Sequence, residues 1–533
     1  MSRLHALLLA LILALTACGD GARQVADDVS LLHRGTGEEP ESLDVHKSRS
    51  TEAGHVQRDL GEGLVGYTPD GELRAAAAER WTISADGTEY VFFLRPEARW
   101  STGEPVTADD FVYSLRRLVN PETAAFYVQS VGEILNANEI IGGEMEVESL
   151  GAEAVDSHQL KISLRRAVPY FISLMSHPST FPVHRGSVEK FGDAHARPGN
   201  LVSNGAYQLV EWAVGSHIEI RRNEYYWDNA NTAIDRVFHY VTPEPIVELN
   251  RYRAGELHVT RTIPPESFKQ MKAERPDEVR VSPALGVYYY GFNMTNPAFG
   301  DNPKLREALS MAIDRDFLVD LVGRGEAPAY SWVPYGTANY DPQTYSWARL
   351  SKDDRERKAR QLYEEAGYGS RRTFRPEIRY NTSETHRQIA VAVQSMWRSV
   401  LGVEARLINE EFQVLLQNIQ QRESIDIFRL NWDGDYNDAH TFLSTLESDN
   451  PSNMTGYQSA EFDSLMQRAG AQIDPDLRKA FLEEAENRML RDHPLIPMYF
   501  YVNKHMVSSR VTGWGDNVLN YHYSQHLSFA ADE

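Results

Sequence analysis

Ile425-Asp426-Ile427-Phe428-Arg429-Leu430-Asn431-Trp432-Asp433-Gly434-Asp435-Tyr436-Asn437-Asp438-Ala439-His440 is the stretch around which the chain is organised. Its first six residues are largely apolar and predict a short, buried strand. The polar residues that follow predict the loop that leaves the carboxyl end of that strand. Ligands of open α/β sheets tend to bind at this end. The stretch therefore indicates an α/β fold with a binding site.

The segments on both sides of this stretch favour the same fold class. Strand-like runs dominate between residues 155 and 290, and helical runs dominate after residue 300. The strand-like runs are 160–164, 217–220 and 237–241, and the helical ones are 303–313, 353–366, 386–401, 460–472 and 476–490. A chain of 533 residues is too long for a single core. It is expected to divide into two or three lobes.

The composition excludes some classes of partner. Hydrophobic residues make up 42% and charged residues 24% of the chain, which are ordinary values for a globular protein. The formal net charge of −22 disfavours nucleic acid and anionic lipid surfaces, because both reward a basic surface. The single cysteine, Cys18, leaves no partner for an internal disulfide.

The N-terminus predicts export. Residues 1–17 hold one arginine and then an apolar run of about ten residues, which is too short to span a bilayer and is typical of a signal peptide. Leu15-Thr16-Ala17-Cys18 resembles a bacterial lipobox, which implies cleavage before Cys18 and a lipid on its thiol. The alternative is an incidental cysteine in a signal that is simply removed. Residues 18–28 then form a tether, and the protein is expected to be lipid-anchored on the periplasmic or outer face of a bacterial membrane.

The chain lacks the common catalytic and metal-binding motifs. It has no G-x-S-x-G elbow, no H-E-x-x-H and no phosphate-binding loop. The run from Asp433 to Asp438 imitates the start of a calcium loop, but its sixth position is Asp438 rather than glycine. We therefore expect no metal, no cofactor and no catalytic residue. A secreted hydrolase that uses a pair of carboxylates stays open as the alternative.

A longer run near the N-terminus carries a family signature. Residues 79–95 predict two strands joined by an Asp-Gly turn, and Thr107 with Asp110 predicts a helix start. The run from Trp81 to Ser114 resembles the signature of the family 5 extracellular solute-binding proteins, which serve dipeptide, oligopeptide and nickel ABC importers. The resemblance continues through the motifs Pro169-Tyr170-Phe171, Asn204-Gly205-Ala206-Tyr207, Tyr288-Tyr289-Tyr290, Ile313-Asp314-Arg315 and Trp432-Asp433-Gly434-Asp435.

The resemblance is to the oligopeptide-binding members of the family, and it implies an architecture. The expected fold is an α/β fold like that of the type II periplasmic binding proteins, with two large lobes joined by a hinge and an inserted third α/β domain. Lobe I takes residues 29–61, 187–285 and 503–533, the inserted lobe II takes 62–186, and lobe III takes 286–502. Such a protein is not an enzyme. It is expected to be a monomer that captures short peptides between closing lobes and delivers them to an ABC permease.

The same resemblance implies roles for individual residues. Asp435 would bind the peptide ammonium, because a buried ammonium needs a carboxylate. The peptide main chain would lie beside Asn431, Trp432 and Asp433 on one edge and beside Ser50 and Thr51 on the other. The remaining roles are the peptide carboxylate for Arg429 and His386, and pocket walls for Tyr127, Tyr289, Phe412 and Trp432.

Three positions depart from the pattern of the oligopeptide binders. Arg49 stands in place of a glutamate, Gln420 in place of an arginine and Arg261 in place of a tyrosine. The two added cations could favour an acidic side chain, or a ligand with an extra carboxylate such as a murein peptide. A metal chelate or another non-peptide solute remains a further alternative.

Overall fold

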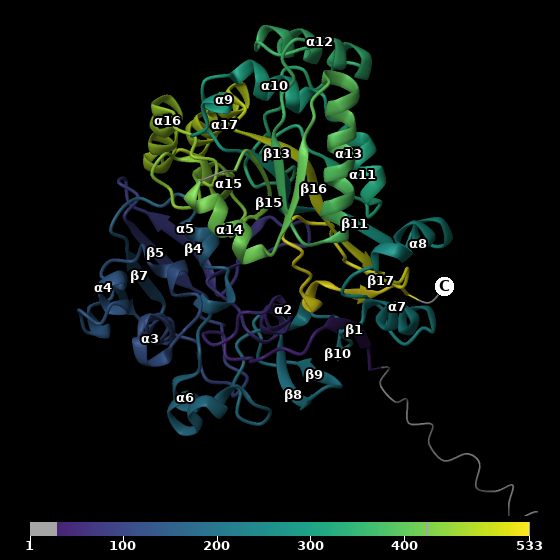
Figure 1. Ribbon diagram of the computed structural model, residues 1–533. Coiled ribbons are helices and arrows are strands. Elements are labelled where there is room, and N and C mark those ends of the chain that lie inside the picture. The colour runs from purple at the N-terminus through teal and green to yellow at the C-terminus, as the bar shows by residue number, and fades with distance from the viewer. Residues whose placement is uncertain (1–28, 423–424, 532–533) are drawn as a thin grey trace, which may run out of the picture.

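The computed structural model describes residues 29–422 and 425–531, and shows an α/β protein with three lobes (Figure 1). Each lobe is built on its own sheet. The predicted signal peptide, Cys18 and the tether lie outside the described residues. Within the described part of the chain, no helix has the length and apolar character needed to cross a membrane.

Lobe I is built on a four-stranded sheet in the order β1-β10-β9-β8, in which β1 and β10 are parallel and the other neighbours are antiparallel. Its strands are β1 (Leu31–Gly37), β8 (Tyr207–Ala213), β9 (His217–Arg222) and β10 (Arg236–Val241), with a small sheet of β17 (Val511–Thr512) and β18 (Ser528–Phe529). Its helices are α2 (Thr51–Leu60), α6 (Arg185–Phe191), α7 (Pro245–Arg253) and α8 (Phe268–Glu274).

Lobe II holds a second four-stranded sheet, in the order β4-β5-β7-β6. The strands of this sheet are β4 (Ala78–Ile83), β5 (Glu89–Leu94), β6 (Ala152–Asp156) and β7 (Gln159–Ser163), and β2 (Val65–Tyr67) and β3 (Leu73–Ala75) form a separate two-stranded sheet. The helices of lobe II are α3 (Ala108–Val119), α4 (Ala137–Ile141) and α5 (Phe171–Leu174). The predicted pair of strands is confirmed, since β4 and β5 pair antiparallel around the Asp86-Gly87 turn. The predicted helix start is also confirmed: the Thr107 amide donates to Asp110 Oδ2 at 2.8 Å.

Lobe III is built on a six-stranded mixed sheet in the order β12-β16-β11-β15-β13-β14. Its strands are β11 (Val279–Phe292), β12 (Ala327–Pro328), β13 (Glu377–Asn381), β14 (Arg406–Glu410), β15 (Ile427–Asp433) and β16 (Leu495–Met506). Its helices are α9 (Pro297–Gly300), α10 (Pro303–Met311), α11 (Arg315–Val322), α12 (Lys352–Glu365), α13 (Glu384–Leu401), α14 (Phe412–Gln421), α15 (His440–Leu443), α16 (Ala460–Ala471) and α17 (Pro475–Asp492). The five helical runs predicted from the sequence coincide with α10, α12, α13, α16 and α17 to within a few residues.

The strand predicted at 425–430 lies further along the chain than expected. β15 starts at Ile427 and continues to Asp433, so Asn431, Trp432 and Asp433 belong to the strand and not to the loop after it. The cause is the neighbouring strand β11, which pairs with every residue of β15 from Ile427, opposite Phe292, to Asp433, opposite Gly286. Tertiary pairing thus overrides the polar character of these three residues.

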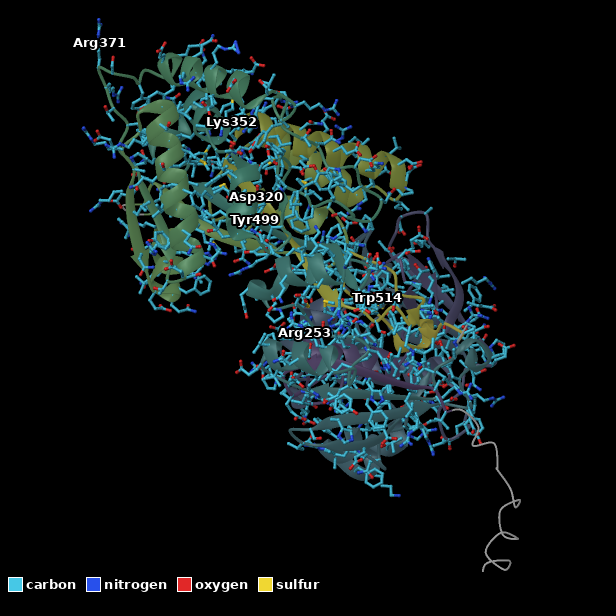
Figure 2. All side chains as sticks on the ribbon, turned by 90° about the vertical axis from the view of Figure 1, so that its right-hand side faces the viewer. Arg253, Asp320, Lys352, Arg371, Tyr499 and Trp514 are labelled. Carbon is cyan, nitrogen blue, oxygen red and sulfur yellow. The ribbon has the colours of Figure 1, made fainter. Side chains whose placement is uncertain are left out.

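Two long strands link lobes I and III. β11 and β16 pair antiparallel over most of their length, and they run from lobe III toward lobe I (Figure 1). Their register breaks between Pro283 and Val287, where β16 advances only from Val502 to Phe500. The side view shows Tyr499, on β16, in the upper body and Arg253, on α7, in the lower one (Figure 2). A local loss of regular pairing in both connecting strands is the property expected of a hinge.

The hydrophobic cores follow the sheets. One core joins buried residues between 287 and 500, a second joins residues between 64 and 175, and two smaller ones belong to lobe I. The exact lobe boundaries given above remain predictions.

Glu486 of α17 fixes a loop of lobe III and gives a test of the core. Its buried carboxylate accepts hydrogen bonds from the amides of Trp332, Val333 and Gln343 at 2.7–2.8 Å and from the Tyr340 hydroxyl at 2.7 Å. An amide at this position would turn its NH₂ group toward donors. We expect Glu486→Gln to cost roughly 2–3 kcal/mol through unpaired buried donors, and to lower the melting temperature by about 5–10 °C.

Thermal unfolding measured by circular dichroism checks this expectation. The exposed Glu484 lies on the same helix. Glu484→Gln is therefore the matched control, and it is expected to leave the melting temperature unchanged. Equal melting temperatures for wild type and Glu486→Gln would contradict the role given to Glu486.

Candidate functional site

The backbone around Asp435 is fixed while its carboxylate is free. The Gly434 amide donates to the Leu285 carbonyl at 2.7 Å, and the Asp435 amide donates to Thr441 Oγ1 at 3.1 Å. Further along the loop, the Asp438 carboxylate accepts two hydrogen bonds from Arg478, at 2.7 and 2.8 Å. The Asp435 side chain is exposed and has no hydrogen bond or ion pair with any residue in the described ranges. It is thus a carboxylate held in place without a partner.

Asp433 and Asp435 form an acidic pair at this end of β15. Burial raises the pKa of Asp433 above its ordinary value, although Asn431 donates to Asp433 Oδ2 at 2.8 Å. Desolvation also raises the pKa of Asp435, and the neighbouring Asp433 charge raises it further. Burial is the main cause of both shifts; the Arg429 charge opposes the shift of Asp433, whereas no cation opposes that of Asp435. A positively charged group would relieve this repulsion.

Lobe II reaches the Asp435 loop. The rings of Tyr170 and Tyr436 stack with centroids 4.4 Å apart and an interplanar angle of 10°. The Tyr436 hydroxyl bonds His440 Nδ1 at 2.8 Å. This contact between two lobes adds a further restraint on the residue next to Asp435.

Lobe I and lobe II also meet near Asp435. The Tyr127 hydroxyl of lobe II donates to the Arg49 carbonyl of lobe I at 3.0 Å. The pKa of Tyr127 is raised by burial and, to a lesser extent, by the charges of Glu41 and Asp435. Ser50 donates its amide to Glu41 Oε1 at 2.9 Å, and its hydroxyl caps α2 by accepting from the Ala53 amide. Of these residues, Tyr127 is the one whose pKa reports the charge of Asp435.

Arg429 lies within β15, four residues before Asp433, and is a buried cation, with 4% of its surface exposed. Its guanidinium lies 4.5 Å above the Tyr288 ring and donates to Asn381 Oδ1 at 3.1 Å and to the Tyr501 hydroxyl at 3.2 Å. It forms no ion pair with a carboxylate of residues 29–422 or 425–531. A buried charge without an opposite charge is costly, and an anion bound beside the guanidinium would offset that cost.

Three further groups surround this end of the site. His386 Nδ1 lies 3.4 Å from the Tyr288 hydroxyl, and desolvation together with the charges of Arg429 and Arg324 lowers the pKa of His386 to about 4. Arg324 donates to Thr385 Oγ1 at 3.1 Å. Lys504 lies 3.7 Å from Glu326. We call Arg324, Arg429 and Lys504 the basic group; His386 beside it is neutral at neutral pH.

The strand between the acidic pair and the basic group has an open edge. β13 pairs with β15 only at Ile427 and Phe428, so residues 429–433 have a strand partner on the β11 side alone within the described chain. Their backbone amides and carbonyls on the other side are available to an extended ligand. Exposed strand edges of this kind accept added strands.

The other predicted residues have different surroundings. Thr51 Oγ1 accepts from Arg261 Nη2 at 3.2 Å, and Arg261 Nε lies 3.6 Å from Glu52, so Arg261 already has an acidic partner. Arg49 is exposed and lies 5.2 Å from the centre of the Phe126 ring.

Four residues predicted to line or border the ligand site lie on lobe III. Tyr289 is buried and packs edge-on against Trp332, with centroids 5.0 Å apart. Trp432 is half-buried, and its Nε1 has no hydrogen-bond partner among the described residues. Phe412 and Gln420 are exposed on α14. The ligand contacts predicted for these residues remain predictions.

One group of side chains in the described ranges could be brought around a metal ion: Glu211, His217 and Glu219, on β8 and β9 of lobe I. Arg236 Nε already donates to the Glu219 carboxylate at 2.8 Å. The group belongs to lobe I and includes none of the site residues.

The sequence analysis gave no role at the site to several residues that lie there. Tyr288 and Tyr501 hold Arg429, and Arg324 extends the basic group. In β11, Tyr288 pairs with Asn431 and Tyr289 pairs with Leu430. Because side chains alternate between the two faces of a strand, this alternation was a signal that could have pointed to Tyr288. No local signal marks Arg324, whose neighbours come from α13.

Comparison with known proteins identifies the family. The model for bacterial extracellular solute-binding proteins, family 5, matches residues 72–454. The periplasmic oligopeptide-binding protein OppA of Escherichia coli is 38% identical over 501 residues, which cover 93% of this chain and 92% of OppA. These matches favour a solute binder over a hydrolase.

Comparison with two solved structures indicates how the lobes of this chain are arranged. MppA, a periplasmic murein tripeptide binding protein in its unliganded open form, matches with a TM-score of 0.91 at 34% identity, covering 94% of this chain and 98% of that one. Haemophilus influenzae OppA in complex with the peptide RPPGFSPFR gives a TM-score of 0.67 at the same 34% identity, over 94% of this chain and 99% of that one. Since identity and coverage are nearly equal, the difference reflects how the lobes are arranged. The chain has the predicted three-lobed α/β architecture in an open arrangement, and it belongs to the family 5 bacterial extracellular solute-binding proteins.

Proposed function

We propose that this protein captures short peptides outside the cytoplasm and delivers them to an ABC permease. The observation that carries the proposal is a pair of charges without ion-pair partners among the described residues: the carboxylate of Asp435, two residues beyond the end of β15, and the buried guanidinium of Arg429 on β15. A peptide is the ligand that brings an ammonium to one end and a carboxylate to the other. The named relatives support this, because OppA binds oligopeptides and MppA a murein tripeptide.

The spacing of the two charges suits a short peptide. Arg429 and Asp433 are four residues apart on β15, which corresponds to about 13 Å at roughly 3.3 Å per residue. Asp435 lies two residues beyond the strand end. An extended peptide of about three to five residues spans this distance when the two side chains reach toward it. Its main chain would add to the open edge at Asn431 to Asp433, with Ser50 and Thr51 on its other side.

Tolerance of many sequences follows from the same arrangement. Main-chain and terminal groups are shared by all peptides, so binding that relies on them does not depend on side chains. Tyr127, Phe412, Trp432 and, after rearrangement, Tyr289 would line the side-chain pockets, where water can adapt to different side chains. Gln420 would border this region.

Binding would be completed by closure. The open arrangement of the lobes and the irregular pairing of β11 with β16 at Pro283 to Val287 support rotation of lobe III toward lobes I and II. Closure would bring Ser50 and Thr51 against the peptide and withdraw its charged ends from water. The closed form would then be the one that the permease recognises.

Calorimetric titration with Ala-Ala-Ala tests the proposal, together with mass spectrometry of the peptide recovered afterwards. We expect one peptide bound per protein and an unchanged peptide mass. A shortened peptide would favour the alternative, a secreted hydrolase that uses the carboxylates of Asp433 and Asp435. Absence of binding by any tripeptide, with binding of a nickel chelate instead, would favour the non-peptide alternative.

The acidic pair predicts a pH dependence. The ammonium binds the ionised form of Asp435, whose pKa in the free protein is raised above the ordinary value of 3.8. Acidification through that raised pKa protonates Asp435, so peptide binding must displace a proton and the affinity falls as the pH falls. Calorimetry on Ala-Ala-Ala between about pH 7 and about pH 4 should show a decline that starts above the range of an ordinary aspartate. The decline should be absent or smaller in Asp435→Asn; an equal decline in both proteins would contradict the assignment.

We also propose that the mature protein carries lipid on Cys18 and is held at the membrane by it. The proposal rests on the sequence Leu15-Thr16-Ala17-Cys18 at the end of the apolar run. Mass spectrometry of the mature protein from a bacterial host should find a chain that begins at Cys18 with the added mass of acyl groups. Cys18→Ser should be recovered without that mass; a mature chain that begins elsewhere would overturn the proposal.

A further inference from the structure

Three side chains with metal-binding atoms meet on the hairpin of β8 and β9 in lobe I. Glu211 lies on β8, and His217 and Glu219 lie on β9. One ligand atom of each residue lies within 4.8 Å of those of the other two. β8 is the edge strand of its sheet, and the hairpin lies at the end of lobe I away from lobe III (Figure 1). The group therefore shares no residue with the peptide site.

The register of the hairpin places the three side chains on one face of the sheet. His217 and Glu219 are two residues apart on β9, so they point to the same side. Glu211 is opposite Glu219 because the register shifts between Leu209 and Glu211. Without the extra residue of this β-bulge, Val210 would be opposite Glu219 instead. The bulge thus brings a second carboxylate beside the first, although like charges opposite one another destabilise a sheet.

His217 is held with one ring nitrogen directed at the carboxylates. Its Nδ1 lies 3.0 Å from Ser216 Oγ, and its Nε2 lies 3.7 Å from Glu211 Oε2. Its ring packs against those of Phe238 and Tyr240, with centroids 5.7 and 5.9 Å away. A histidine that binds a metal through one nitrogen commonly has the other nitrogen fixed by a hydrogen bond. When Nδ1 donates to Ser216, Nε2 offers its lone pair to an ion.

The Glu219 carboxylate is buried and keeps one oxygen for a further partner. The residue is 6% exposed. Arg236 donates to Glu219 Oε1 from both Nε, at 2.8 Å, and Nη2. Glu219 Oε2 has no hydrogen bond with any residue of the described ranges. Arg236 balances one of the two carboxylates, so these three side chains together keep one negative charge.

We propose that Glu211, His217 and Glu219 bind a divalent transition-metal ion, with zinc as the ion that suits them best. Zinc accepts one imidazole nitrogen and two carboxylate oxygens at about 2.0–2.2 Å, in a tetrahedron completed by water. Ligand atoms in such a tetrahedron lie about 3.4 Å apart. The Glu211 side chain is 57% exposed and free to move the remaining distance. Bonds to the ion would replace the repulsion between two facing carboxylates.

Calorimetric titration with zinc tests the proposal on protein prepared without a histidine tag. We expect one zinc ion per protein with micromolar affinity. Excess Mg²⁺ should not displace it, because Mg²⁺ prefers oxygen ligands alone. Glu211→Gln and His217→Gln should each weaken zinc binding at least about tenfold. Glu211 is exposed on an edge strand, so Glu211→Gln decides the matter if His217→Gln is unstable.

His158→Gln is the matched control. His158 lies between β6 and β7, and its Nδ1 is 2.8 Å from Ser157 Oγ, as in the pair of Ser216 and His217. It belongs to no group of metal-binding side chains in the described part of the chain. This variant should bind zinc as wild type does, whereas Ser216→Ala, which removes no ligand, should weaken binding about tenfold.

Three results would overturn the proposal: no zinc bound by wild type, displacement of zinc by Mg²⁺, or zinc affinity unchanged in both Glu211→Gln and His217→Gln. The proposal does not depend on the proposed function. Ala-Ala-Ala should bind equally well with and without zinc, because the hairpin lies outside the peptide site. Failure of the peptide to bind would therefore contradict the proposed function alone.

Discussion

Replacing Asp435 by asparagine weakens the binding of Ala-Ala-Ala by about 30-fold or more, which corresponds to roughly 2 kcal/mol. The physical reason is that the peptide ammonium leaves water on closure and then lacks the carboxylate that balances its charge. Asparagine keeps the size of the side chain, and the Asp435 amide keeps its bond to Thr441. Calorimetric titration of wild type and variant measures the difference.

N-acetylation of the peptide provides the control for this prediction. The acetylated peptide has no ammonium, so wild type should bind it far more weakly than the free peptide. Asp435→Asn should bind the two forms with more similar affinities, because the variant has no charge to pair with the ammonium. Equal affinities of wild type for the free and acetylated peptides would refute the role of Asp435.

Replacing Arg429 by methionine weakens the binding of Ala-Ala-Ala by an amount of similar size, about 2–3 kcal/mol, through loss of the partner of the peptide carboxylate. The same change should leave the melting temperature of the ligand-free protein unchanged or raise it. Arg429 is a buried cation without an acidic partner, and an apolar side chain of similar length removes that cost. Calorimetry and thermal unfolding on the same two proteins test both parts.

A loss of peptide affinity together with an unchanged or raised melting temperature distinguishes a binding role of Arg429 from a structural one. If Arg429 served only to hold Tyr288, Asn381 and Tyr501 in place, its loss would destabilise the ligand-free protein. A peptide with an amidated C-terminus is the matched ligand, and Arg429→Met should reduce its affinity much less than that of the free acid. A lower melting temperature together with equal losses for both peptides would contradict the assignment.

The predictions from the sequence that are confirmed concern local structure. The pair of strands around Asp86-Gly87 and the helix start at Thr107 depend on residues a few positions apart, and both are confirmed. The predicted end of β15 was wrong because the true end depends on pairing with β11, more than 130 residues earlier in the chain. Polar residues at 431–433 indicate a loop when considered alone, and only the pairing with β11 makes them a strand.

The residues of the site also divide into those that the sequence predicted and those that only the structure shows. Asp435 and Arg429 were expected from the family resemblance, and the structure adds why they suit a ligand: neither forms an ion pair with any residue of 29–422 or 425–531. Arg324 was not expected, because its place beside Thr385 and His386 brings together segments about 60 residues apart. Arg261 was noted as an added cation that could favour an acidic ligand, and the structure shows that Glu52 accompanies it.

The most direct test of the central claim, that a peptide closes the lobes, is small-angle X-ray scattering of the protein during titration with Ala-Ala-Ala. The ligand-free protein should scatter as the open arrangement described above. Added peptide should lower the radius of gyration and stop doing so at one peptide per protein, since closure brings lobe III against lobes I and II. A radius of gyration that stays constant while calorimetry shows the peptide to be bound would contradict the account.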